Sequence, residues 1–188
     1  MKDKVSLGVD KRDWRPSPLP GQIVLVTTVN PDGTTNVAPK SWIAMIAFDP
    51  PLLALGCNLA HWTAVNILAQ REFVVNMPSA DLIEMVWRSA ALPHPRPVEA
   101  LGLTARPAMR VRPPCIEECV AHLECVLDTH LTYGAEVILL GRIVAATIDQ
   151  AAGQTGDPYA YLRPPFFLEN GVYGVIERGH RVGDRREA

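Results

Sequence analysis

The sequence predicts a mainly β fold in which short antiparallel strands close, or nearly close, into a barrel with a few short helices. About seven runs of β-branched and apolar residues follow one another at close spacing, separated by Pro, Gly and Asn turns. The 17 prolines fall mostly in pairs and clusters, which suits rigid loops between short strands better than long helices. The strands do not alternate regularly with crossover helices, so a doubly wound parallel sheet is not expected.

The first part of the chain is expected to form strands interrupted by one short helix. An Asn-Pro-Asp-Gly turn at residues 30–33 joins the first two strands as a hairpin. A change to helical periodicity predicts a helix at residues 63–70, with Thr63 as a plausible N-cap. The expected strands are residues 22–29, 34–38, 41–48, 52–57 and 72–77.

The second part of the chain is expected to contain two long strands between short helices and loops. Ser79 would cap a helix at 79–87, and a proline-rich loop leads to a short helix at 98–103. The remaining segments are expected to be strands at 116–127, 137–148 and 172–176, a turn at 128–136, a polar loop at 150–157 and an aromatic segment at 159–168. Residues 1–19 are interpreted as an extension, 20–176 as one domain and 177–188 as a charged tail.

Composition excludes several classes of protein. The 188 residues are 48% hydrophobic and 20% charged, which is enough for one sizeable core and argues against disorder. A net charge of −2 gives no electrostatic reason to expect nucleic acid or an anionic membrane as a partner. The first residues lack the apolar segment of a secretory signal, and no run approaches the roughly 18 apolar residues of a membrane span. A cytoplasmic protein is therefore expected.

Cysteine and histidine positions do not indicate a metal site. The four cysteines, Cys57, Cys115, Cys119 and Cys125, match neither a paired metal-binding spacing nor a disulfide framework. Reduced core thiols are the expectation. The five histidines are too scattered for a ligand set, so no metal is expected. The chain also lacks the G-x-G-x-x-G and P-loop patterns.

The most informative block of sequence lies between residues 36 and 76. It reads N-V-A-P-K-S-W at 36–42, D-P-P at 49–51, H-W-T-A-V-N-I at 61–67 and E-F-V-V-N at 72–76. These motifs, in this order and at these separations, resemble the flavin-reductase-like, FMN-binding split β-barrel family, of the flavoredoxin or NAD(P)H:flavin oxidoreductase type. The resemblance extends from about residue 20 to 176.

The resemblance implies an antiparallel Greek-key split barrel that forms a homodimer and binds FMN, with NAD(P)H as co-substrate. No catalytic acid or base is expected, because the cofactor carries the chemistry. The residues placed in the cofactor site by the motifs are Asn36, Ala38, Pro39, Lys40, Ser41, Trp42, Cys57, Asn58, His61, Trp62, Thr63 and Asn66.

Physical chemistry suggests how parts of this set would meet FMN. The start of the expected helix offers unpaired amides to a phosphate, with donors from His61 and Thr63 and support from Asn58 and Asn66. The Ser41 segment would face the ribityl chain or the pyrimidine edge of the ring. A cation at Lys40 would stabilise the negative charge that a flavin gains on reduction.

Each of these residues also has a purely structural interpretation. Thr63 is able to cap the helix, Asn36 to satisfy loop backbone and Cys57 to be a packed thiol. Trp42 and Trp62 are equally suited to a core or a subunit interface.

The sequence departs from the family pattern in two places. Many family reductases carry Gly-Asp-His before the penultimate long strand, where this chain has Gly134-Ala135-Glu136, and a glutamate faces an anionic dinucleotide unfavourably. His61 and Trp62 replace the usual basic residue and aspartate before the threonine. The alternatives left open are an NAD(P)H-dependent FMN oxidoreductase, a flavoredoxin-like FMN electron carrier, and an interaction module without cofactor.

Overall fold

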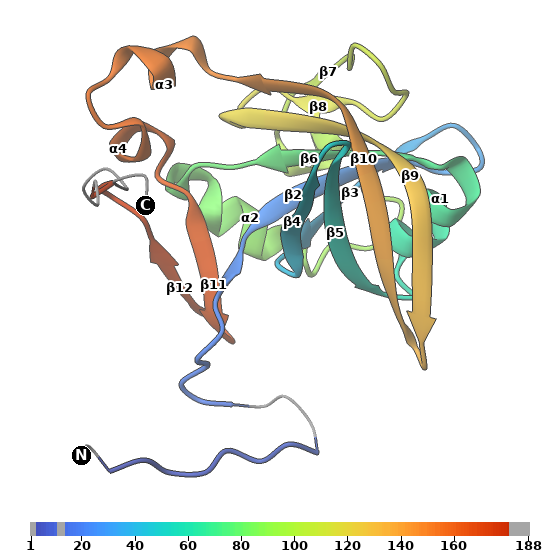
Figure 1. The fold of residues 1–188 in the computed structure, drawn as a ribbon. Helices are drawn as coiled ribbons and strands as arrows, with labels where there is room; N and C mark the ends of the chain where they lie inside the picture. The colour runs from blue at the N-terminus through green and yellow to red at the C-terminus, as the bar shows by residue number, and fades with distance from the viewer. Residues whose placement is uncertain (1–2, 11–13, 181–188) are drawn as a thin grey trace.

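The computed structural model describes residues 3–10 and 14–180. Its main feature is a seven-stranded antiparallel sheet, curled into a barrel, with the order β3-β2-β6-β9-β10-β5-β4 (Figure 1). β3 and β4 are neighbours in the chain yet occupy the two ends of this order, so the barrel is split between them. The seven strands are β2 (Val24–Val29), β3 (Thr35–Lys40), β4 (Ile43–Phe48), β5 (Pro51–Asn58), β6 (Glu72–Met77), β9 (Ala121–Tyr133) and β10 (Glu136–Ile148).

The connections follow a Greek-key pattern. β2–β3, β4–β5 and β9–β10 are hairpins, and β5 and β6 pair with opposite sides of the β9–β10 hairpin. The helix α1 (Trp62–Gln70) makes the crossing from β5 to β6 and packs Ala64 and Ile67 into the barrel core. The mainly β Greek-key split barrel expected from the sequence is confirmed.

Alternation along β2 divides the interior into two cores. Val24 and Val26 point into the barrel, with Phe73 and Leu139 among their fully buried companions. Leu25 points the other way, into a second core beneath the helices outside the barrel. This period of two is what a strand buried on both faces requires.

The outer layer consists of short elements. The second core is covered by η1 (Ala80–Leu82), α2 (Ile83–Ser89), η2 (Val98–Leu101) and the two-residue strands β7 (Ala105–Arg106) and β8 (Cys115–Ile116). The other outer elements are β1 (Gly21–Gln22), α3 (Gln150–Gln154), α4 (Pro158–Leu162), β11 (Pro165–Glu169) and β12 (Val172–Val175). β1, β11 and β12 form a separate small sheet near α2 (Figure 1).

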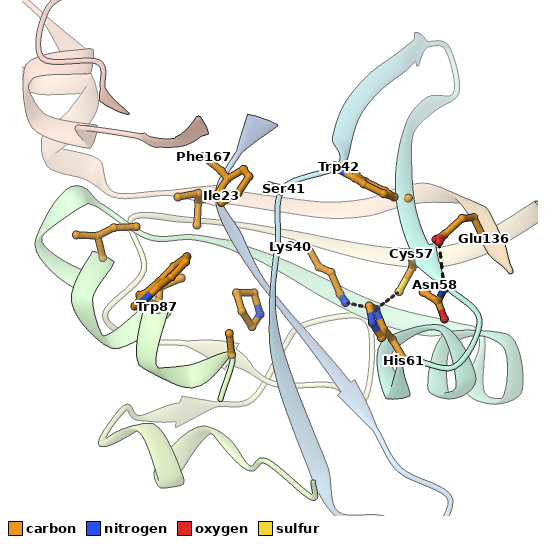
Figure 2. Close-up of a pocket in the computed structure, with 15 residues that line it drawn as sticks. Ile23, Lys40, Ser41, Trp42, Cys57, Asn58, His61, Trp87, Glu136 and Phe167 are labelled. Carbon is orange, nitrogen blue, oxygen red and sulfur yellow. Dashed lines mark hydrogen bonds between the residues drawn. The ribbon is translucent and has the colours of Figure 1, made fainter. Parts of the chain in front are cut away.

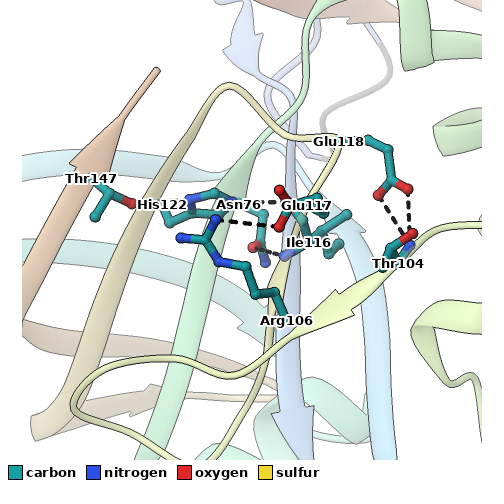
Figure 3. Close-up of polar contacts among 8 residues, drawn as sticks. All are labelled: Asn76, Thr104, Arg106, Ile116, Glu117, Glu118, His122 and Thr147. Atoms are coloured by element: carbon teal, nitrogen blue, oxygen red, sulfur yellow. Dashed lines mark hydrogen bonds and ion pairs between the residues drawn. The ribbon is translucent and has the colours of Figure 1, made fainter. Parts of the chain in front are cut away.

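Buried hydrogen bonds join the outer layer to the barrel (Figure 3). The Asn76 amide donates to the Leu25 carbonyl and the Thr27 hydroxyl, and its oxygen accepts from the Ile116 N–H at 2.9 Å. His122 lies between the Ile116 carbonyl, 2.8 Å from Nε2, and the Thr147 hydroxyl, 3.0 Å from Nδ1. β8 is therefore fixed to β6 and β9 by polar contacts as well as by packing, and the same Asn76 side chain ties β6 to β2.

The open edge of β3 is partly covered. The Val37 N–H donates to the carbonyl of Arg96 at 2.8 Å, which brings the loop of residues 90–97 against the strand. Pro39, two residues further along β3, lacks a backbone N–H, so this edge presents no unpaired donor at that position. This contact brings a segment distant in sequence to the split in the barrel.

Most expected elements are confirmed to within a few residues, and all four cysteines are buried and unpaired. Three expectations were wrong. The strand expected at 116–127 is interrupted after Ile116 by a turn. Ile116 and Cys119 are buried in the second core, whereas Cys125 and Leu127 are buried in the barrel core, so the chain has to change direction between them. The turn expected at 128–136 consists of Gly134 and Ala135 alone, because β9 continues to Tyr133 and β10 begins at Glu136. The loop expected at 150–157 contains α3.

The N-cap of α1 was also misassigned. His61 occupies that position, with extended backbone and no side-chain cap. Thr63 lies inside the first turn of α1 and is buried, so its hydroxyl does not cap the helix.

Candidate functional site

A pocket of about 480 Å³ opens at the split in the barrel, between β3, the Ser41–Trp42 link that follows it, the end of β5 and α2 (Figure 2). We call it the main pocket. Its walls are mostly apolar and aromatic, with a few polar groups at the end near α1. It is lined by Ile23, Pro39, Lys40, Ser41, Trp42, Gly56, Cys57, Asn58, His61, Ile83, Val86, Trp87, Ala90, Glu136 and Phe167.

A cation and an imidazole meet in this pocket. Lys40 Nζ lies 3.4 Å from His61 Nδ1, and Cys57 Sγ lies 3.7 Å from the same nitrogen (Figure 2). The ammonium has only donors, so Nδ1 accepts and the proton of the neutral ring resides on Nε2. Partial burial, then the nearby Lys40, lowers the pKa of His61. Burial raises the pKa of Cys57, which makes it a packed thiol rather than a nucleophile.

An acidic group lies on the same side of the pocket. Glu136, at the start of β10, accepts a hydrogen bond of 3.1 Å from the Asn58 amide. The Asn58 oxygen in turn accepts from the Ala60 N–H, which fixes the loop before α1. Glu136 therefore has a defined position in the pocket wall.

Close contacts with glycine fix the residues that link β3 and β4. A Cβ on Gly56 would lie 3.1 Å from Trp42, so any other residue at position 56 would require the Trp42 side chain to shift from its place against β5. The Trp42 carbonyl accepts from the Gly56 N–H at 2.8 Å. A Cβ on Gly21 would overlap the Ser41 carbonyl. The Ser41–Trp42 link is therefore held from both sides.

A second hollow, of about 300 Å³, continues from the main pocket toward the start of α1. We call it the polar pocket. It shares Pro39, Lys40, His61 and Ala90 with the main pocket, so the two form one continuous depression. Its full lining is Asn36, Ala38, Pro39, Lys40, Ala60, His61, Trp62, Thr63, Ala90, His94 and Arg96.

The polar pocket contains buried polar atoms without partners. Thr63 is 1% exposed, and its hydroxyl oxygen contacts no hydrogen-bonding group in the described chain. Nε of Arg96 is likewise buried and unpartnered, although its terminal nitrogen donates to the Leu92 carbonyl. Buried polar groups are seldom left unpaired, because each costs roughly 1–3 kcal/mol. Thr63 and Arg96 both line the same hollow, beside the unpaired amides at the start of α1.

Two aromatic rings border this pocket. Trp62 and His94 stack with centroids 3.9 Å apart and an angle of 5° between the rings. His94 Nδ1 also lies 3.1 Å from the Asn36 side-chain oxygen. Burial, then the neighbouring Arg96 charge, lowers the pKa of His94. Trp62 and Asn36 are therefore held by the loop of residues 90–97.

The structure brings together all the residues placed in the site by sequence except one. Those residues line the main pocket, the polar pocket or both. The exception is Asn66, which is fully buried and donates to Thr28 and Asn30, so it ties α1 to β2 and the following turn. Sequence reasoning missed Arg96, His94 and Trp87 as lining residues. His94 and Arg96 lie in the proline-rich loop and Trp87 in the helix before it, and neither segment carries a motif that points to the site.

Comparison with known proteins establishes the family. Residues 17–167 match the model of the flavin reductase like domain, and the chain belongs to that family. An uncharacterized protein of Archaeoglobus fulgidus is 31% identical over 147 residues, covering 76% of this chain and 83% of its own. No helix in the described residues is long and apolar enough to cross a membrane.

Solved structures share the fold. Nitrilotriacetate monooxygenase component B from Bacillus cereus superposes with a TM-score of 0.81 at 22% identity, over 99% of this chain and 100% of that one. An FMN-binding protein from Thermus thermophilus gives a TM-score of 0.78 at 18% identity, over 97% of this chain and 100% of that one. At these identities the likeness concerns the split barrel.

Proposed function

We propose that the chain binds FMN along the continuous depression, with the flavin ring in the main pocket and the phosphate in the polar pocket. The observation that carries this proposal is the pairing of an apolar, aromatic hollow with a polar one that contains two buried unpartnered groups. FMN has the same two-part character, a flat ring system joined to a phosphate.

The donors of the polar pocket fit a phosphate. Arg96 supplies positive charge, the Thr63 hydroxyl and the N–H at His61 Nε2 supply hydrogen bonds, and the start of α1 supplies amides. In the main pocket, Lys40 and the backbone at Ser41 would face the polar edge of the ring, and aromatic walls would exclude water from it. Cys57 and Asn58 would act as packing and loop support.

The proposed activity is that of an FMN-dependent oxidoreductase with NAD(P)H as donor. FMN, when bound, supplies the hydride chemistry, so the protein needs no acid–base pair beside it. Family membership supports this class, as does the presence of a nitrilotriacetate monooxygenase component and an FMN-binding protein among the structural relatives.

One observation favours an alternative, a flavoredoxin-like electron carrier. Glu136 is fixed in the wall of the main pocket by Asn58. Its carboxylate would repel the pyrophosphate of a nicotinamide dinucleotide if that group lay nearby. A carrier that receives electrons from a protein partner would not meet this repulsion.

A spectroscopic titration tests both proposals. We expect the purified protein to bind FMN and show the visible absorbance of a flavin, and NADH or NADPH to bleach it under anaerobic conditions. Bleaching by a chemical reductant but by neither nucleotide would reject the reductase and leave the carrier. Failure to bind FMN would reject both.

We also propose that the chain forms a homodimer in the cytoplasm. Phe48 on β4 is 95% exposed and Tyr133 on the β9–β10 hairpin is 86% exposed, so the barrel carries apolar side chains that a partner subunit would cover. The four unpaired thiols are compatible with a reducing compartment. Phe48→Glu should shift the sedimentation coefficient from dimer to monomer, and a wild-type monomer would reject the dimer.

A further inference from the structure

The polar pocket is larger than a phosphate requires. A phosphate group fills about the space of two or three water molecules, each of which takes roughly 30 Å³, whereas the hollow measures about 300 Å³. Lys40 and His61, which also line the main pocket, mark the end nearest the proposed flavin ring. Asn36, Trp62 and His94 line the polar pocket but not the main one. Space for a further group therefore remains at the end away from the ring.

The Trp62 side chain starts at the point where the phosphate would bind. The backbone N–H groups of Ala64 and Val65 both donate to the His61 carbonyl. Trp62 and Thr63 are the first two residues of α1, so their N–H groups have no acceptor within the helix, and no other described group accepts from them. These are the amides available to a phosphate. The indole of Trp62 therefore leaves the backbone directly beside that group.

The Trp62 indole is held as a flat platform. His94 covers one face of it, with ring centroids 3.9 Å apart and an angle of 5° between the rings, and is itself 3.1 Å from the Asn36 side-chain oxygen. Trp62 is still 45% exposed, so much of its other face is open to solvent. A large aromatic face of this kind is the surface on which nucleic-acid bases stack, whatever their identity.

The charges around the polar pocket favour an anionic ligand. Its charged lining residues, Lys40 and Arg96, are both cations, and none of the described lining residues is acidic. Asp32, whose charge acts on His94, lies outside the lining and accepts hydrogen bonds from the N–H and hydroxyl of Thr34. This positive charge and the free amides of α1 suit a ligand in which the first phosphate is joined to a second.

We propose that the site binds FAD, in which adenosine monophosphate is joined to the phosphate of FMN, and that the adenine stacks on the open face of Trp62. The inference rests on the FMN orientation proposed above and adds a position for a base to it. The flavin ring would lie in the main pocket, the two phosphates near Arg96 and the start of α1, and the adenine in the remaining part of the polar pocket.

Equilibrium dialysis against equal concentrations of FMN and FAD tests this proposal, because chromatography of the bound flavins gives the ratio of the two affinities directly. We expect the wild-type protein to retain at least ten times more FAD than FMN. Equal retention, or a preference for FMN, would overturn the inference and leave the FMN function standing. Retention of neither flavin would reject the flavin function as well.

Variants of Trp62 locate the adenine. Trp62→Ala should bring the FAD-to-FMN ratio close to one, and Trp62→Phe, which keeps an aromatic face, should retain most of the preference. Trp62→Leu should behave like Trp62→Ala and replaces it if thermal unfolding shows that the alanine variant is not folded. An unchanged ratio in the alanine or leucine variant would overturn the stacking on Trp62.

Trp87→Ala is the matched control. Trp87 is also about half exposed, at 52%, but it lines the main pocket and not the polar pocket. Its loss should change the affinities for FMN and FAD by the same factor and leave their ratio as in the wild type. A fall in the ratio equal to that of Trp62→Ala would mean that the preference does not arise at Trp62, and would overturn the inference.

Discussion

Two buried polar clusters in this protein look alike in composition but differ in how their hydrogen bonds are satisfied. Around Asn76 and His122, each side-chain polar atom contacts a partner in the protein (Figure 3). In the polar pocket, Thr63 and Arg96 each keep a buried atom unpaired. The first cluster is complete within the fold and therefore structural. The second is incomplete, and a ligand rich in oxygen atoms would complete it.

The largest expected effect breaks the complete cluster. Asn76→Ala leaves the Ile116 N–H and the Leu25 carbonyl without their buried partner. We expect a loss of about 3–5 kcal/mol in the free energy of unfolding, measured by chemical denaturation. A loss below about 1 kcal/mol would mean that water replaces the amide and that the two clusters do not differ as argued.

The incomplete cluster should respond in the opposite way. Thr63→Val keeps the shape of the side chain and removes an oxygen that has no partner, so stability should stay the same or rise by up to ~1 kcal/mol. FMN affinity should fall roughly tenfold, because a hydrogen bond to a charged group is lost. Fluorescence titration with riboflavin, which lacks the phosphate, is the control and should show no change. A loss of stability with unchanged FMN affinity would contradict the assignment.

Lys40 gives a smaller and electrostatic effect. Lys40→Met removes the cation next to His61 in the main pocket. The reduction potential of bound FMN should fall by on the order of 20 mV, the equivalent of ~1 kcal/mol for a two-electron couple. Lys40→Arg, which keeps a positive charge at this position, should show the same reduction potential as the wild type in the same redox titration. Equal potentials in all three proteins would place the ammonium away from the ring.

The smallest expected effect is a dependence of stability on pH. His61 has a pKa below its ordinary 6.5, first through burial and then through Lys40. As pH falls through 6.5 the unfolded chain takes up this proton before the folded chain does, so stability declines until the pH is below the folded pKa. His94 contributes in the same direction. Subtracting the unfolding curve of His61→Gln from that of the wild type should show this decline, and a difference that stays flat with pH would contradict it.

Local chemistry accounts for what the sequence predicted well. The strands follow from alternation and from turn residues such as those at 30–33, both of which act over a few neighbours. The long β9–β10 hairpin was underestimated because its polar residues at 128–133 suit a turn by composition, although β-branched Thr129 and Thr132 pair with β10.

Tertiary placement accounts for what the sequence missed. Thr63 and Asn66 lie one turn apart on the same helix, and only the docking of α1 sends one to the polar pocket and the other to Thr28 and Asn30. Arg96 reaches the site because its carbonyl accepts from Val37, a contact between residues far apart in sequence. Neither outcome is encoded in the spacing of residues.

The covered edge of β3 has a consequence for how these sheets associate. The Val37 N–H is already bonded to the Arg96 carbonyl and Pro39 has no N–H, so a strand from another molecule finds few donors to pair with along β3. β4, at the opposite border of the described sheet, has no further strand of that sheet beside it. Growth of the sheet by an added strand is thus directed to a single side, which favours a closed pair of molecules over an open-ended fibre.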